Sequence, residues 1–357
     1  MDNIVFLAQF PPPVHGLSVA VKTLYESNIK QEFSFEKINL TNNRAFLKNM
    51  IQIIKSGRKN YYFTISQTKG GNLRDLIILK VLEMKRAHCL VHLHGGYYRT
   101  LVDHDIPNWQ KKWNYRAMKK IDGAIVLSDS LKWIFTGMLP EGRIHVVPNC
   151  VDDSCLCSAD DFEAKTKAIS ENKIHHVLYL SNFIRSKGYD VVLELAKREK
   201  EQVQATGTKR YHFDFAGKFF DEEEERYFNQ FVEENELHNY ITYHGIVGGE
   251  KKAKLLKLCD IFALITRYPN EGQPISIIEA MANGMYIITT DHAGVPALVE
   301  DGKNGLLLSK EKDHDISYIY DHMQPSVEIA ENNRKDVELH YLQKHYIQNM
   351  ADVFRKV

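Results

Sequence analysis

Short, continuously apolar segments alternate with amphipathic helical segments along almost the whole of this 357-residue chain. A segment that is apolar throughout, rather than at every second residue, is typical of a strand in a parallel sheet covered by helices on both faces. Two successive series of such segments predict two doubly wound, Rossmann-like α/β domains. The first series comprises residues 3–8, 35–40, 61–65, 88–94, 123–127 and 144–147, and the second comprises 176–180, 211–215, 241–244, 260–265, 285–290 and 305–308. Helices are expected at 18–30, 44–57, 73–85, 108–120, 188–200, 221–236, 250–258, 275–283 and 336–355.

The length of the chain also favours two domains, because 357 residues exceed what one ordinary hydrophobic core holds. The polar segment 152–172 is expected to be a linker followed by a helix. Ligands of open parallel sheets bind at the carboxyl ends of the strands. Two facing domains would therefore place a binding site in the cleft between them.

The composition, 44% hydrophobic and 26% charged residues, is that of a globular protein. No apolar run approaches the roughly 18–20 residues that a membrane-spanning helix needs. The N-terminal segment MDNIVFLAQFPPP lacks the basic region of a signal peptide. Five cysteines without a repeated spacing favour a reducing compartment. We therefore expect a cytoplasmic location.

The net charge is zero, but residues 1–150 hold 21 Lys and Arg against 11 Asp and Glu. Segment 44–59 mixes apolar residues with cations, as a helix lying at a membrane surface would. Segment 109–120 combines Trp109, Trp113 and Tyr115 with five cations, and such aromatic residues favour the headgroup level. These segments predict peripheral attachment to an anionic membrane surface. The alternative is that both helices pack their apolar sides on the first sheet. No nucleic-acid partner is expected.

The stretch YPNEGQPISIIEAMANG at 268–284 carries two glutamates separated by seven residues. Glu271 lies in a Pro-, Asn- and Gly-containing loop, and Glu279 lies on a helix expected to begin near Pro274. The amides of a helix start can bind an anion, and carboxylates accept hydrogen bonds from the vicinal hydroxyls of a sugar or ribose. From spacing alone, two surface glutamates around an ordinary loop–helix junction remain an alternative.

Three further segments carry candidate binding or catalytic residues just after an expected strand ends. In FPPPVHGLSVA (10–20), Gly16 stands before a helix expected to be capped by Ser18, so that backbone amides could approach a pyrophosphate. In HLHGG (92–96), His94 would lie at the carboxyl edge of the first sheet. Each also has an ordinary structural explanation, as a turn glycine or a hydrogen-bonded histidine.

In SNFIRSKGYDVVLELA (181–196), Arg185 and Lys187 stand at a strand-to-helix turn, where cations can neutralise a diphosphate leaving group. Solvated loop charges are the alternative. No D-x-D element lies near the end of an expected strand, so we predict no metal and no cofactor.

Together these segments resemble family-four retaining glycosyltransferases of the two-domain GT-B type (glycosyltransferase group 1), especially members that build surface polysaccharides. The resemblance covers nearly the whole chain in the right order. It includes VPALVEDGKNGLLL (295–308), FAGKF (215–219) and VVPNCVDD (146–153), in which Cys150 replaces the family's glycine. The resemblance implies an acceptor-side domain at 1–160, a nucleotide-sugar-binding domain at 161–335, and a C-terminal helix at 336–357 that returns to the first domain.

The resemblance also implies roles for individual residues. Glu271 would contact the sugar hydroxyls, Glu279 the ribose, and His94 the transferred sugar. Lys187 matches the lysine of the family's K-G pair, and Arg185 takes the arginine role because Ser181 stands at the usual arginine position. The implied catalytic residues are His94, Lys187 and Glu271. The implied donor-binding residues are Gly16, Arg185, Lys187, Gly217, Glu271, Gly272, Gln273, Pro274 and Glu279.

The resemblance therefore predicts a retaining, metal-independent glycosyltransferase of the hexosyltransferase type. It would move a sugar from a nucleoside-diphosphate sugar to a glycan or lipid-linked acceptor in bacterial polysaccharide or glycoconjugate synthesis. Two alternatives remain open: a nucleotide-sugar epimerase of GT-B type, and a non-catalytic nucleotide-sugar-binding or glycan-binding protein.

Overall fold

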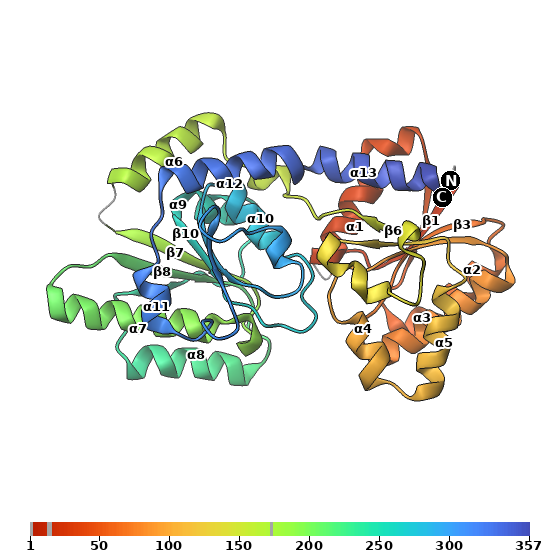
Figure 1. The fold of residues 1–357 in the computed structure, drawn as a ribbon, viewed down its shortest axis with the longest axis horizontal. Helices are drawn as coiled ribbons and strands as arrows, with labels where there is room; N and C mark the ends of the chain where they lie inside the picture. Colours follow the sequence, from red (N-terminus) through yellow and green to blue (C-terminus); the bar gives the residue numbers. More distant parts are fainter. Residues whose placement is uncertain (1–2, 13–15, 172–173) are drawn as a thin grey trace. The chain divides into compact units, whose positions relative to one another are not determined.

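The structure, a computed structural model, describes residues 3–12, 16–171 and 174–357 (Figure 1). The chain forms two compact units. The first contains Met1–Cys150, Asn270–Gln273 and Gln343–Val357, and the second contains Val151–Pro269 and Pro274–Leu342. The first unit's main segment thus ends before the domain boundary expected at residue 160.

Each unit contains a parallel sheet that has six strands in the described part of the chain. The strands of the first sheet are β1 Asn3–Ala8, β2 Ser34–Asn39, β3 Asn60–Thr64, β4 His88–His92, β5 Gly123–Val126 and β6 Ile144–Val146. Those of the second are β7 His175–Leu180, β8 Tyr211–Ala216, β9 Ile241–Tyr243, β10 Ile261–Leu264, β11 Tyr286–Thr290 and β12 Gly305–Leu308. The fold class predicted from the apolar runs, two doubly wound α/β sheets, is confirmed.

The strand orders are those of doubly wound folds. The first sheet runs β2-β1-β3-β4-β5-β6 and the second runs β12-β11-β10-β7-β8-β9. In such sheets the direction of winding reverses at one point, and a crevice opens there beyond the carboxyl ends of the strands. The reversal lies between β1 and β3 in the first sheet and between β7 and β10 in the second.

Helices cover both faces of the first sheet (Figure 1). Residues of β1 alternate between the two sides: Val5 and Leu7 belong to one core cluster, and Phe6 belongs to the other. The helices of the first unit are α1 Gly16–Glu26, α2 Phe46–Lys55, α3 Lys69–Met84, α4 Tyr98–Thr100, α5 Asn108–Met118 and α13 Gln343–Lys356. Helices α1 and α13 pack together on the Phe6 side, whereas α2, α3 and α5 form a layer on the Val5 side. This burial of both faces explains why the central strands β1, β3, β4 and β5 are largely apolar.

In the second unit one hydrophobic core joins the sheet to the helices around it. These helices are α7 Tyr189–Thr206, α8 Glu222–Glu234, α9 Gly249–Leu258, α10 Ile275–Ala282, α11 Ile316–Asp321 and α12 Val327–His340. Helix α6 Ala159–Glu171 packs on α9 and α12. The structure departs from the prediction at the C-terminal helix. The single helix expected at 336–355 is two helices, because the Tyr341 carbonyl accepts a hydrogen bond from the Val151 amide (2.8 Å) at the break between them.

The described residues include no helix that is both long enough and apolar enough to cross a membrane.

Candidate functional site

At the carboxyl edge of the first sheet, His94 and Gly95 follow β4 and Gln67 follows β3. The Gln67 side-chain carbonyl accepts a hydrogen bond from the Tyr97 amide at 2.6 Å, which holds the two loops together. A side chain at Gly95 would clash with the Gln67 amide and with the Asn270 carbonyl. The glycine after His94 is therefore required by the close approach of two other segments.

The loop Asn270–Gln273 also belongs to the first unit and lies against the same edge. A Cβ atom at Gly272 would clash with the His94 carbonyl and the Gly95 Cα. The Asn149 amide donates to the Gln273 side chain (2.7 Å), and the Asn149 side chain donates to the Gln273 carbonyl (2.8 Å). Glu271 is buried within this loop. The structure therefore brings together His94, Glu271, Gly272 and Gln273, which the sequence predicted as site residues.

His92 is a further residue at this edge, and the sequence analysis missed its role. Its ring lies 3.9 Å, centre to centre, from the ring of His94. Its Nδ1 atom lies 2.7 Å from the Tyr62 hydroxyl, and both of these side chains are fully buried. Burial, together with the neighbouring His94, holds the pKa of His92 well below its usual value, which favours the neutral ring that lies against His94. The alternation in His92-Leu93-His94, which places both rings on one side, was the available signal.

Gly16 lies at the start of α1, next to the point where the first sheet reverses its winding. Its neighbour His15 lies outside the described residues. The N-cap predicted at Ser18 is wrong: α1 begins at Gly16, so Ser18 is inside the helix and buried. The helix starts earlier than the apolar pattern alone indicated.

In the second unit, Lys187 lies where the sheet reverses its winding, in the turn that follows β7. Its ammonium group lies 5.0 Å from the ring centre of Tyr268, in the segment that follows β10. Gly188 has a φ of +76° and packs so closely against the Ile265 carbonyl that a side chain would clash with it. This crevice is where a doubly wound sheet places a nucleotide.

Arg185 occupies the same turn, but its guanidinium interacts with α8. It forms an ion pair with Glu224 (3.0 Å), donates to the Tyr189 hydroxyl (3.2 Å) and lies over the Tyr227 ring at 3.5 Å. A diphosphate would have to compete with Glu224 for this cation. The diphosphate role of Arg185 stays a prediction.

Gly217 follows the carboxyl end of β8, as expected. Its φ is +149°, and a Cβ atom there would collide with the Ser181 carbonyl. Its amide donates to the Gly245 carbonyl at 2.9 Å. The packing of three segments thus accounts for a glycine at this position, while its contact with a nucleotide stays a prediction.

Glu279 lies on α10, which begins directly after Pro274 as predicted. Its carboxylate accepts a hydrogen bond from Lys252 of α9 at 2.6 Å and is buried. Burial raises the pKa of the Glu279 carboxyl, and Lys252 partly offsets this shift. The Cys155 thiol also lies 3.7 Å from the carboxylate. The sequence analysis missed Lys252, since nothing in the pattern of α9 separates it from the neighbouring lysines.

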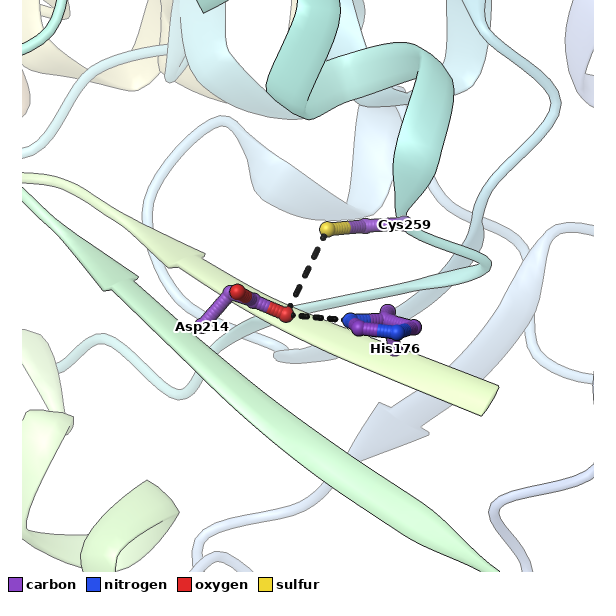
Figure 2. Close-up of side chains that lie close together, drawn as sticks. All are labelled: His176, Asp214 and Cys259. Atoms are coloured by element: carbon purple, nitrogen blue, oxygen red, sulfur yellow. Dashed lines mark hydrogen bonds and ion pairs between the residues drawn. The ribbon is translucent and has the colours of Figure 1, made fainter. Parts of the chain in front are cut away.

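One group of described residues has the composition of a metal site: His176, Asp214 and Cys259, whose ligand atoms lie within 4.8 Å of one another (Figure 2). The His176 Nδ1 and Asp214 carboxylate are 2.7 Å apart, the distance of a hydrogen bond. The second Asp214 oxygen lies 2.6 Å from the His244 ring. These hydrogen bonds account for the cluster without an ion. His176 and Cys259 also lie at the amino ends of β7 and β10, away from the Lys187 crevice.

Comparisons with known proteins show what this chain is similar to. Residues 160–321 match the family model described as glycosyl transferases group 1. Mannosylfructose-phosphate synthase of Agrobacterium fabrum is 24% identical over 285 residues, which cover 72% of this chain and 60% of the relative. The putative colanic acid biosynthesis glycosyltransferase WcaL of Salmonella typhimurium is 29% identical over 136 residues, which cover 37% of this chain and 32% of the relative. The matches thus span less than two thirds of both relatives.

Among solved structures, Anabaena Alr3699/HepE in complex with UDP superposes with a TM-score of 0.73 at 15% identity, with all of both chains covered. At this identity the likeness shows the fold, which is GT-B. The chain is therefore similar to the group 1 glycosyltransferases, as its motifs predicted, and the similarity to the family model lies in residues 160–321.

Proposed function

We propose that this protein transfers a sugar from a nucleoside-diphosphate sugar to a glycan or lipid-linked acceptor in polysaccharide or glycoconjugate synthesis. The observation that carries the proposal is the crevice between β7 and β10. There Lys187 and the glycine at the start of α7 lie against the segment that follows β10, and this segment continues to Glu271 and Glu279. A helix start and a cation at such a crevice suit a diphosphate. The family match and the UDP complex of the similar Anabaena structure support this assignment.

The proposed reaction exchanges one bond at the anomeric carbon. The bond from this carbon to the leaving diphosphate oxygen breaks, and a bond to the acceptor oxygen forms on the same face, so the configuration is retained. The acceptor's proton passes to the leaving phosphate, and no protein nucleophile is required. Lys187 and the amides after Pro274 would meet the charge that develops on the diphosphate. Glu271 and His94 would hold the sugar, and Glu279 the ribose.

Turnover of the donor tests this function. Incubation of the protein with a panel of nucleotide sugars should raise its unfolding temperature for the true donor, because a ligand that binds only the native state stabilises that state. The donor so identified should then release nucleoside diphosphate in the presence of acceptor, and the product should keep the anomeric configuration of the donor by NMR. An epimerised nucleotide sugar would favour the epimerase alternative, and binding without any turnover would favour a non-catalytic protein.

We also propose that the reaction needs no metal ion. Lys187 lies at the proposed diphosphate crevice, whereas the His176–Asp214–Cys259 cluster has its histidine and cysteine at the amino ends of their strands. Activity should therefore survive excess EDTA within about twofold, since less than about 0.4 kcal/mol of transition-state stabilisation would be lost. Loss of activity that magnesium or manganese restores would show that the phosphate site has been assigned wrongly.

A further inference from the structure

The helical layer of α2, α3 and α5 carries apolar side chains that do not pack on the sheet beneath it. In α2, Met50 and Ile53 are buried against the sheet. Leu47, Ile51 and Ile54 are instead 76%, 52% and 58% exposed, and their spacing puts them on one face of the helix. The alternative stated above, that this segment packs its apolar side on the first sheet, holds for Met50 and Ile53 and does not hold for the three exposed side chains.

The same layer is strongly basic. Helix α2 contains Lys48 and Lys55, and α5 and the two residues after it contain five cations; neither segment has an acidic residue. In α3, Asp75 is buried against Arg74. The exposed apolar residues Met84 of α3 and Trp109 of α5 extend the surface beyond α2.

A cavity of about 440 Å³ opens between α3 and α5. Its apolar lining includes Leu82 and Trp113, and Arg116, Lys119 and Lys120 stand exposed around it. Among the described residues that line the cavity, the acidic one is Glu83, and it is paired with Lys80 at 2.8 Å. The cavity lies where β4 and β5 begin, at the opposite edge of the sheet from His94. It is thus distinct from the proposed sugar site.

One aromatic residue expected at a membrane surface has another role. Tyr115 donates a hydrogen bond to Asp103 at 3.0 Å, and the Arg99 guanidinium lies over its ring. The ring centres of Trp109 and Trp113 are 6.5 Å apart. Trp109 lies on the outer side of α5, and Trp113 lies beside the cavity.

We propose that the outer face of α2, α3 and α5 is a docking surface for an anionic phospholipid bilayer, with the α3–α5 cavity receiving a phosphate headgroup. The exposed apolar stripe of α2 would enter the headgroup boundary, and the cations around it would meet the anionic lipids. An anionic bilayer offers both a charged headgroup layer and an apolar interior, so it matches both the cations and the exposed side chains of Leu47, Ile51 and Ile54. The proposal deepens the proposed function by bringing the enzyme to a lipid-linked acceptor, but its test measures binding and not activity.

Vesicle co-sedimentation of the full chain tests the proposal. The protein should sediment with vesicles of equal parts phosphatidylglycerol and phosphatidylcholine, and remain in the supernatant with phosphatidylcholine alone. Binding should weaken as salt is raised from about 0.05 to 0.5 M, because the screening length then falls below roughly 5 Å. Equal sedimentation with neutral and anionic vesicles would overturn the proposal, as would no sedimentation with either at low salt.

Two triple variants locate the surface. The variant Leu47→Ser, Ile51→Ser, Ile54→Ser and the variant Arg116→Ser, Lys119→Ser, Lys120→Ser should each weaken vesicle binding at least about tenfold. Matched controls on the second unit change exposed residues of the same types: Ile246→Ser, Leu258→Ser, Leu339→Ser, and Lys251→Ser, Lys254→Ser, Lys310→Ser. The controls should bind vesicles like the wild type.

Thermal shift and analytical ultracentrifugation distinguish a loss of vesicle binding from misfolding and from self-association. All four variants should keep the thermal shift that UDP produces in the wild type, which shows that they are folded and that the donor site is independent of this surface. Wild-type vesicle binding in both surface variants would overturn the proposal. A wild type that is dimeric by analytical ultracentrifugation, together with a monomeric Leu47, Ile51, Ile54 variant, would show that the surface binds a second copy of the chain instead.

Discussion

Replacement of Glu271 by Gln should lower kcat about 10- to 100-fold, because a charge-assisted hydrogen bond is worth roughly 1.5–3 kcal/mol and about 1.4 kcal/mol is tenfold in rate. Gln keeps the size of the side chain but loses the charge. Glu271 is buried in a loop that packs on His94 and Gly95, so its position is set by the protein and not by the substrate. If its interaction is made mainly in the transition state, KM should change little.

The control for this experiment is Glu250→Gln, which makes the same chemical change at an exposed position at the start of α9. It should leave kcat and the unfolding temperature unchanged. A Glu271→Gln protein that unfolds like the wild type and retains full activity would remove Glu271 from the catalytic assignment.

Replacement of Lys252 by Met should destabilise the protein by about 2–3 kcal/mol, because it leaves the buried Glu279 carboxylate without its cation. For a unit of this size the unfolding temperature should fall by roughly 4–12 °C. Met retains an apolar side chain of similar length, so little packing is lost. Lys251→Met, which changes the exposed neighbour, is the matched control and should have no effect.

The stability lost in the Lys252→Met variant should be smaller at acid pH than at neutral pH. Burial raises the pKa of the Glu279 carboxyl above its ordinary value of 4.5, and removal of Lys252 takes away the group that opposes this shift. The folded variant then binds a proton more readily than the unfolded chain, so its stability falls as pH rises through the window above 4.5. Thermal unfolding at acid and neutral pH should therefore show a smaller deficit in acid. A deficit that is the same at both would contradict the assignment of the effect to this carboxylate.

A double variant separates stability from binding. Lys252→Met combined with Glu279→Gln removes both charges and should recover much of the lost stability. Its affinity for the nucleoside diphosphate of the donor found in the nucleotide-sugar panel should nevertheless stay about 10- to 100-fold below that of the wild type, because the proposed ribose acceptor is gone. Recovery of both stability and this affinity would show that Glu279 serves only the fold.

The central strands of each sheet were predictable because they are buried on both faces, so that their apolar character appears in the sequence without reference to their neighbours. Helix ends were less predictable. Helix α3 begins at Lys69, before the expected residue 73, because Thr68 caps it by accepting the Gly71 amide. The break between α12 and α13 depends on a hydrogen bond from Val151, which is remote in sequence.

The sequence by itself determined the alternation of strands and helices, the two sheets, and the motif that marks Glu271 and Glu279, since these features are local or recur along the chain. Only the tertiary structure decided which groups these residues meet. Lys252 lies 27 positions from Glu279, Glu224 lies 39 from Arg185, and Asn149 lies 124 from Gln273. The packing of separate elements around a sheet determines which of these residues become partners. Their hydrogen bonds and ion pairs require a separation of a few ångströms, and the spacing of residues in the sequence does not specify such a distance.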